Sequence, residues 1–66
     1  MTVAALRSEA ARIVRARFNR GDSAVAMAAD YGVSRNIIYL WASGKSRPSR
    51  TVAGRIVAAE KARVSP

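Results

Sequence analysis

The 66-residue sequence contains no cysteine and no histidine. It can therefore form no disulfide, and an ordinary zinc site would have no ligands. Acidic residues are few and scattered, namely Glu9, Asp22, Asp30 and Glu60. No histidine base, thiol nucleophile, carboxylate pair or glycine-rich phosphate loop is present. The sequence gives no support for an enzyme, and we expect no metal, no cofactor and no small-molecule substrate.

Long apolar runs are also missing. Arginine or polar residues break each apolar run well before the roughly 18 residues that a membrane span requires. No stretch resembles a secretory signal, so a reducing cytoplasmic setting is expected. A chain this short buries only roughly 60% of its unfolded surface. We expect one domain over residues 1–66, with a core formed by helix packing.

Positive charge is abundant. Twelve lysine and arginine residues against four acidic residues give a net charge of +8. This excess is typical of proteins that bind a polyanion, with nucleic acid the first candidate and an anionic membrane surface the second. Charge of this kind also has a plain interpretation as a contribution to solubility. Most of the cations are arginine, which suits phosphate groups and guanine edges.

The spacing of apolar residues predicts helices and no strands. The four predicted helices cover residues 3–18, 23–31, 35–43 and 50–63. The expected fold is all-α, a compact bundle of about four short helices containing a helix-turn-helix. In the first helix the predicted apolar stripe is Val3, Leu6, Ala10, Ile13, Val14 and Phe18. Its arginines (Arg7, Arg12, Arg15 and Arg17) lie mostly off that stripe and are expected on a solvated face, where one or two near the helix end could reach a phosphate.

Residues that favour helix ends occur at the predicted helix boundaries. The predicted N-terminal caps are Thr2, Asp22 or Ser23, Ser34 and Ser49. Gly21, Gly32 and Gly44 stand where helices end and the chain turns, and Gly21 suits a left-handed cap. Gly54 weakens the fourth helix and is interpreted as a close packing contact. Residues 64–66 are expected to be a frayed tail.

Two faces are predicted for the third helix. Ile37, Ile38, Trp41 and Ala42 share one side, while Asn36, Tyr39, Leu40 and Ser43 share the other, with Arg35 on the flank. The preceding helix has an apolar face of Ala24, Met27, Ala28 and Tyr31. Tyr31 and Trp41 are therefore expected in the core. The polar side of the third helix is expected to face water or a partner.

Residues 23–44 resemble the helix-turn-helix of phage repressors and Cro-like regulators. Ala28 stands at the small position, Gly32 stands at the turn, and the apolar positions are Met27, Tyr31, Val33, Ile38 and Trp41. The resemblance covers about a third of the chain. It implies a sequence-specific double-stranded DNA-binding transcriptional regulator, of phage or prophage type, that occupies an operator and is nucleoid-associated in a bacterial host.

An α-helix fits the major groove of B-DNA, where its exposed side chains reach base edges. The predicted base-reading residues are Ser34, Arg35, Asn36, Tyr39, Leu40 and Ser43. Asn36 has the donor and acceptor needed to bond to adenine. Arg35 could form a bidentate contact with guanine or bind a phosphate. By the resemblance, the first turn of this helix contributes most of the specificity. The predicted phosphate-binding residues are Ser23, Lys45, Ser46, Arg47 and Arg50.

Several alternatives stay open at the level of sequence. The fourth helix could form a homodimer through Val52, Ile56 and Val57, or the same residues could close the monomer core. The same motif would suit the DNA-binding module of a recombinase, transposase or excisionase. Other interpretations are a basic amphipathic protein at anionic membranes, a protein-binding inhibitor of the transcription machinery that uses Tyr39 and Leu40, and the headpiece of a longer repressor.

Overall fold

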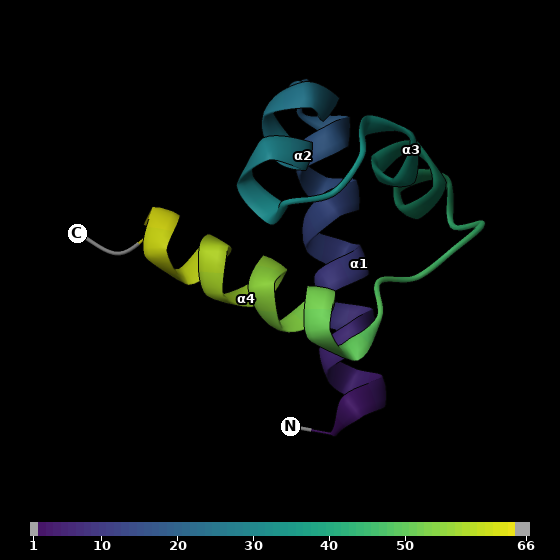
Figure 1. Cartoon of the computed structure of the whole chain (residues 1–66), viewed down its shortest axis with the longest axis vertical. Helices are drawn as coiled ribbons and strands as arrows, with labels where there is room; N and C mark the ends of the chain where they lie inside the picture. The colour runs from purple at the N-terminus through teal and green to yellow at the C-terminus, as the bar shows by residue number, and fades with distance from the viewer. Residues whose placement is uncertain (1, 65–66) are drawn as a thin grey trace.

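Four helices make up the described part of the chain. The computed structural model describes residues 2–64, in which α1 covers Val3–Asn19, α2 covers Ala24–Tyr31, α3 covers Arg35–Ser43 and α4 covers Arg50–Val64 (Figure 1). No strand occurs within residues 2–64. The prediction of an all-α bundle of about four short helices is confirmed.

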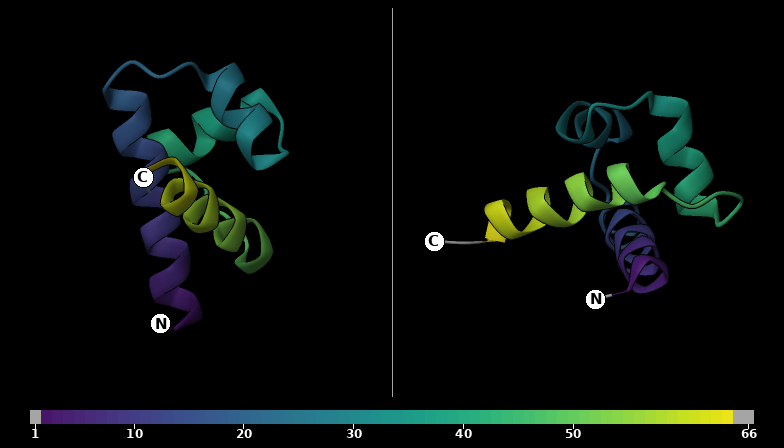
Figure 2. Two further views of the ribbon diagram at one scale, coloured as in Figure 1. Left: turned by 90° about the vertical axis from the view of Figure 1, so that its left-hand side faces the viewer. Right: turned by 60° about the horizontal axis from the view of Figure 1, so that its bottom comes forward.

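The long α1 is the helix against which α3 and α4 pack, and α2 packs against α3 and α4. Helix α4 crosses α1 and makes the most extensive contact with it. Helices α2 and α3 lie near the C-terminal half of α1, and the three-residue turn 32–34 connects them (Figures 1 and 2). Because α3 packs only through one side, its other side remains at the margin of the molecule (Figure 2, right).

All four helices contribute to one hydrophobic core. Its buried members are Ala10, Ile13, Val14, Ala24, Met27, Ala28, Tyr31, Ile38, Trp41, Ala53 and Ile56. The predicted inner face of the second helix is entirely among them, and so are Tyr31 and Trp41. Small side chains such as Ala24 and Ala28 let α2 approach its neighbours closely.

Side-chain caps at three helix starts follow the prediction. The hydroxyls of Thr2, Ser23 and Ser49 accept hydrogen bonds from the backbone N–H groups of Ala5, Ala26 and Val52. Ser23 is thus the residue before α2 and not its first helical residue. Ser34 has the extended backbone of an N-cap but accepts no such hydrogen bond.

Several local expectations are wrong. Asp22 does not cap α2, because its carboxylate accepts hydrogen bonds from arginine side chains instead. At the end of α1, by contrast, Gly21 takes the predicted left-handed conformation, with φ of 97°, directly after the C-cap residue Arg20. Gly54 marks no close packing contact, since a Cβ there would meet open space. Helix α4 includes Val64, while residues 65 and 66 lie outside the described range.

The predicted apolar stripe of α1 is interrupted at both ends. Val3 and Phe18 are exposed, whereas Ala10, Ile13 and Val14 are buried. The helix is longer than the body it packs against, so its first turn extends beyond the core (Figure 1). Phe18 lies instead at the edge of α3, where it contacts Tyr39.

Arg17 is buried, contrary to the solvated position expected from the α1 pattern. The residue is only 7% exposed. Its Nε donates to Asp22 Oδ2 at 2.7 Å, and its Nη1 donates to Asp30 Oδ2 at 3.2 Å and to Tyr31 Oη at 3.0 Å. These bonds connect the end of α1 to the α1–α2 connection and to the last turn of α2, after which the chain turns toward α3.

Helix α4 closes the core of the single chain. Ile56 is completely buried, and Val52 and Val57 are half-buried against the same core. Ile56 is therefore not a dimer-surface residue, and the monomer-core alternative applies to it. Within residues 2–64, no helix has both the length and the apolarity needed to cross a bilayer.

Candidate nucleic-acid interface

The turn between α2 and α3 determines how α3 is presented. Gly32 ends α2 in the left-handed conformation, with φ of 69°. Its N–H and that of Val33 both bond to the carbonyl of Ala28. The chain turns sharply here, and α3 then places Ile38 and Trp41 in the core. Arg55 of α4 donates to the Tyr31 carbonyl at 3.4 Å, which attaches α4 to this turn.

The predicted outer face of α3 is exposed throughout. It comprises Arg35, Asn36, Tyr39, Leu40 and Ser43, with Ser34 directly before the helix. Tyr39 is 47% exposed and Leu40 is 40% exposed. The Ser43 hydroxyl donates to the Leu40 carbonyl at 3.1 Å, so its proton is already engaged. The remaining polar side chains of this face have no hydrogen-bond partner within residues 2–64.

Phe18 is a member of this surface that the sequence pattern did not identify. Its ring meets the Tyr39 ring edge-on, with centroids 5.7 Å apart and planes at 84°. Edge-to-face pairs of this kind add about 0.5–1.5 kcal/mol beyond the area they bury. The contact holds Tyr39 against α1. An i, i+4 apolar step from Val14 to Phe18 was the only sequence signal, and it indicated a core residue.

One group of cations is engaged in ion pairs or hydrogen bonds within the protein. Every acidic side chain pairs with arginine: Glu9 with Arg12, Asp22 with Arg17 and Arg20, Asp30 with Arg17, and Glu60 with Arg63. Arg7 and Arg55 donate to backbone carbonyls. Hydrogen bonds from Arg20 and Arg17 hold the pKa of the Asp22 carboxyl well below its usual range.

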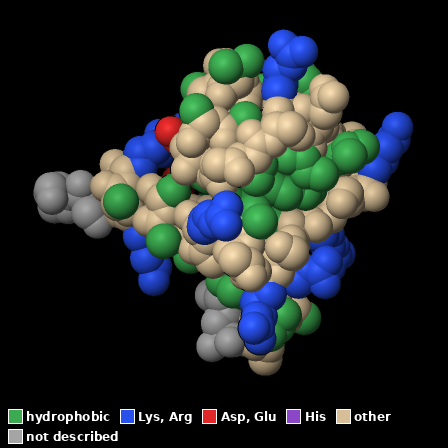
Figure 3. Space-filling model, in the orientation of Figure 1, with side chains coloured by type: hydrophobic (Ala, Val, Ile, Leu, Met, Phe, Trp, Pro, Cys, Tyr) green, Lys and Arg blue, Asp and Glu red, His purple; other side chains and the backbone are tan. Residues whose placement is uncertain are grey.

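Most of the other cations lie near the two ends of α3. Within residues 2–64, the cations that make no hydrogen bond or ion pair are Arg15, Arg35, Lys45, Arg47 and Arg50. Arg35 begins α3, Lys45 and Arg47 directly follow it, and Arg50 begins α4. On the face seen in Figure 3, lysine and arginine side chains project on every side, whereas acidic side chains are visible only near one edge. The positive charge near α3 is therefore not neutralised by the protein.

The loop after α3 is held in place. The N–H groups of Lys45 and Ser46 bond back to the Leu40 carbonyl, at 3.1 and 3.4 Å. Arg7 of α1 donates to the carbonyl of the buried Pro48 at 2.8 Å. These contacts give the predicted phosphate-binding residues of the loop a defined position beside α3.

The predicted phosphate set is not a single cluster. Lys45, Ser46 and Arg47 occupy one loop, and Arg50 follows at the first turn of α4. Ser23 stands apart, at the first turn of α2, where its hydroxyl accepts the Ala26 N–H. Because that acceptor role leaves the hydroxyl proton available, Ser23 can still donate to an anion.

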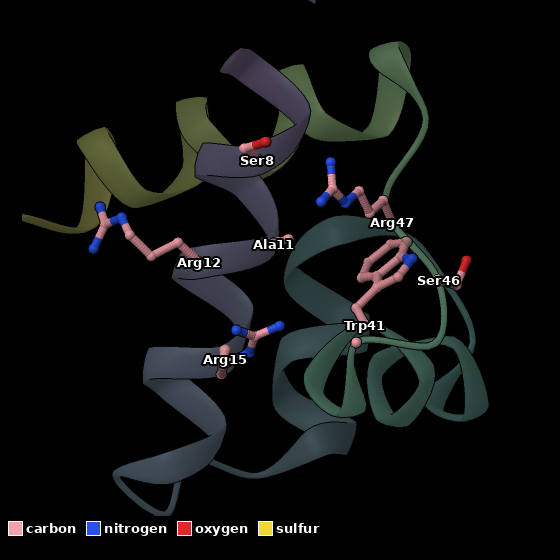
Figure 4. Close-up of a pocket in the computed structure, with 8 residues that line it drawn as sticks. Ser8, Ala11, Arg12, Arg15, Trp41, Ser46 and Arg47 are labelled. Carbon is pink, nitrogen blue, oxygen red and sulfur yellow. The ribbon is translucent and has the colours of Figure 1, made fainter. Parts of the chain in front are cut away.

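A cavity of about 180 Å³ lies between α1 and this loop. It is lined by Ser8, Arg12 and Arg15 from α1, and by Trp41, Ser46 and Arg47 from the other side (Figure 4). None of its lining residues is acidic. The cavity adds α1 to the charged surroundings of α3, a combination that adjacent positions in the sequence do not indicate.

No family model, curated protein or solved structure matches the chain. The function is therefore inferred from the exposed side of α3 and from the charges around it. A metal centre finds no candidate ligands, since residues 2–64 hold no group of three or more suitable side chains.

Proposed function

We propose that this chain binds double-stranded DNA with α3 in the major groove. The single observation on which the proposal depends is the exposed face of α3, with cations at the start of the helix and in the loop after it that have no partner within residues 2–64. A helix can enter the groove when one side is exposed along its length, and α3 meets that condition. Unpaired arginine and lysine beside it would meet the phosphates that border the groove.

The side chains of α3 suggest a division between base and backbone contacts. Asn36 can bond in a bidentate manner to adenine, Arg35 can do so to guanine, and Leu40 can contact a thymine methyl group. Arg47 and Lys45, which follow the helix, are proposed to bind phosphates and to contribute no sequence preference.

The proposed biological role is a sequence-specific transcriptional regulator of the phage repressor and Cro-like type, which residues 23–44 resemble. Occupying an operator would block the polymerase. One copy presents a single short helix, so tight binding would require two copies on half-sites about one helical turn, or roughly 34 Å, apart. A nucleoid-associated location in a bacterial cytoplasm would follow from this role.

Selection of bound duplexes from a random library tests the proposal. We expect a defined site for the wild-type chain. Asn36→Ala should relax the preference at particular base pairs and cost about 1–3 kcal/mol there, because a bidentate base contact is lost. The measurement is the affinity for the selected site and for single-base variants of it.

Arg47→Ala is the matched control for that experiment. It should weaken binding to all sequences alike and make the salt dependence shallower. If Asn36→Ala and Arg47→Ala change the selected site in the same way, the division between base and backbone contacts is wrong. If the wild-type chain selects no sequence and binds no duplex, the proposed function fails.

The exposed aromatic surface favours a second candidate function. Phe18, Tyr39 and Leu40 are exposed and adjacent, and such residues are common at protein interfaces. An inhibitor that binds a protein of the transcription machinery would use them. That candidate predicts complex formation with the protein partner and no binding to duplex DNA.

A further inference from the structure

The cavity between α1 and the α3–α4 loop contains two opposed guanidinium groups. Arg15 extends from α1 and Arg47 extends from the loop, and both point into the space between them (Figure 4). A terminal nitrogen of Arg15 lies 3.4 Å from the point that a Cβ on Gly44 would occupy, so this side chain reaches the end of α3. Arg12 turns away from the space and pairs with Glu9.

The cavity offers hydrogen-bond donors without a matching acceptor. Arg15 and Arg47 make no hydrogen bond or ion pair within residues 2–64. Trp41, which is only 3% exposed, also lines the cavity. Two like charges facing one space repel each other unless an anion lies between them. The two guanidinium groups are donors only, which is the complement of a phosphate group.

The cavity also borders the proposed DNA-binding surface. Arg15 and Phe18 are one helical turn apart on α1, so they lie on the same side of that helix. Phe18 contacts Tyr39 on the exposed face of α3. Arg47 follows α3 by only a few residues. A phosphate bound between the two arginines would thus stand beside a duplex whose groove contains α3.

We infer that this cavity binds a backbone phosphate of the duplex, with Arg15 and Arg47 as its two cationic ligands. The inference rests on the proposed DNA-binding function and extends it by assigning a phosphate contact to α1. Helix α1 then acts as more than a support for the core. The Trp41 ring forms part of the cavity wall, so its fluorescence reports whether the cavity is occupied.

The first test compares two charge-neutralising variants of the full-length chain. Arg15→Gln and Arg12→Gln remove the same charge from the same helix, and both residues line the cavity, but only the guanidinium group of Arg15 points into it, because that of Arg12 turns away to Glu9. Fluorescence anisotropy with a labelled duplex, repeated over a range of salt concentrations, measures both. We expect Arg15→Gln to weaken binding to every duplex and to reduce the slope of log K against log salt by about 0.9, the value for one phosphate contact. Arg12→Gln should leave the slope unchanged.

The second test uses the only tryptophan of the chain. Duplex DNA should change Trp41 emission in the wild-type chain, and in Asn36→Ala at saturating duplex. In Arg15→Gln the emission change should be lost at duplex concentrations where anisotropy still reports binding. Inorganic phosphate is the comparison probe. A response to inorganic phosphate without a response to duplex would assign the cavity to a free anion and overturn the inference.

The outcomes separate the two proposals. If the wild-type chain binds no duplex, the proposed function fails and the inference fails with it. If it binds duplex, but Arg15→Gln and Arg12→Gln have equal slopes, the cavity inference is overturned and DNA binding stands. Arg15 is exposed and unpartnered, so its variant should melt like the wild type by circular dichroism. Should it not, Arg15→Met, which removes the same charge and keeps the aliphatic part of the side chain, is judged by the same slope.

Discussion

Arg17 connects three parts of the chain through one guanidinium group. Its partners are Asp22 in the α1–α2 connection, Asp30 in the last turn of α2, and the hydroxyl of Tyr31 in the core. The carboxylates are partly exposed, so water can solvate them if the arginine is removed. The Tyr31 hydroxyl is in the interior, where an unpaired polar group is costly.

Replacing Arg17 should therefore destabilise the fold. We expect Arg17→Met to lower the free energy of unfolding by about 1–3 kcal/mol, since it leaves the Tyr31 hydroxyl without its partner. Arg20→Met, which also removes an ion pair to Asp22 but from an exposed position, should cost clearly less, because ion pairs in water contribute little to stability. Urea denaturation followed by circular dichroism measures both. Equal losses would contradict the role assigned to burial.

Asp22 makes the stability of the fold dependent on pH in the acidic range. Hydrogen bonds from Arg20 and Arg17 lower the pKa of its carboxyl in the folded chain. The stabilisation is complete above the ordinary aspartate pKa of about 3.9 in the unfolded chain, and it is lost as the pH falls from there toward the lower folded value. Asp22→Asn should reduce stability at pH 7 and flatten the decline between neutral and acidic pH. Thermal melts at several pH values measure this, and parallel declines in the two proteins would contradict it.

At the scale of elements, the turn 32–34 decides where α3 lies. Gly32 has φ of 69°, a conformation that costs an L-residue about 1–2 kcal/mol. A Cβ there would also lie 3.5 Å from the side chain of Arg55, which is ordinary contact. The penalty at Gly32 thus comes from the backbone conformation and not from crowding.

Two glycine substitutions with opposite expected signs test this point. Gly32→Ala should destabilise the fold by about 1–2 kcal/mol. Gly54→Ala, in the interior of α4 where the added methyl meets open space, should stabilise it by up to about 1 kcal/mol. Chemical denaturation gives both values. A stabilising Gly32→Ala would contradict the left-handed turn.

Element boundaries and inner faces follow from local chemistry. Helix α3 covers residues 35–43 as the spacing predicts, because Gly44 takes a left-handed cap conformation and Pro48 prevents continuation of the helix. The apolar face of α2 and the two faces of α3 follow from helical periodicity alone. Burial of Arg17 and the Phe18–Tyr39 contact do not, since each depends on residues that are distant in the chain.

At the scale of the whole molecule, the core is shared among four short helices. Ile56 is completely buried in it and comes from the last helix. Folding of a single chain can therefore bury the main apolar residue of α4 without a second copy. The molecule measures 32 × 28 × 19 Å, so one copy covers at most about one turn of DNA, roughly 34 Å.

Ile56→Ala distinguishes a core residue from a dimer residue. We expect a loss of about 2–5 kcal/mol, as for other buried aliphatic truncations. The melting temperatures of the wild type and of the variant should not depend on protein concentration, because a monomer unfolds in a unimolecular reaction. Differential scanning calorimetry at two concentrations measures this. A melting temperature that rises with concentration would indicate that association contributes to the stability of the fold.

The sequence by itself determined the helices, their inner faces and the net charge of +8, because these depend on short-range periodicity, capping and composition. It also determined which side of α3 is exposed. Only the tertiary structure decided which cations stay unpaired and which pair with carboxylates. Arg17 of α1, for example, bonds to Asp30 and Tyr31 of α2. The cavity between Arg15 and Arg47 has the same origin. Long-range packing brings these groups together, and no local sequence pattern indicates which residues distant in the chain will meet.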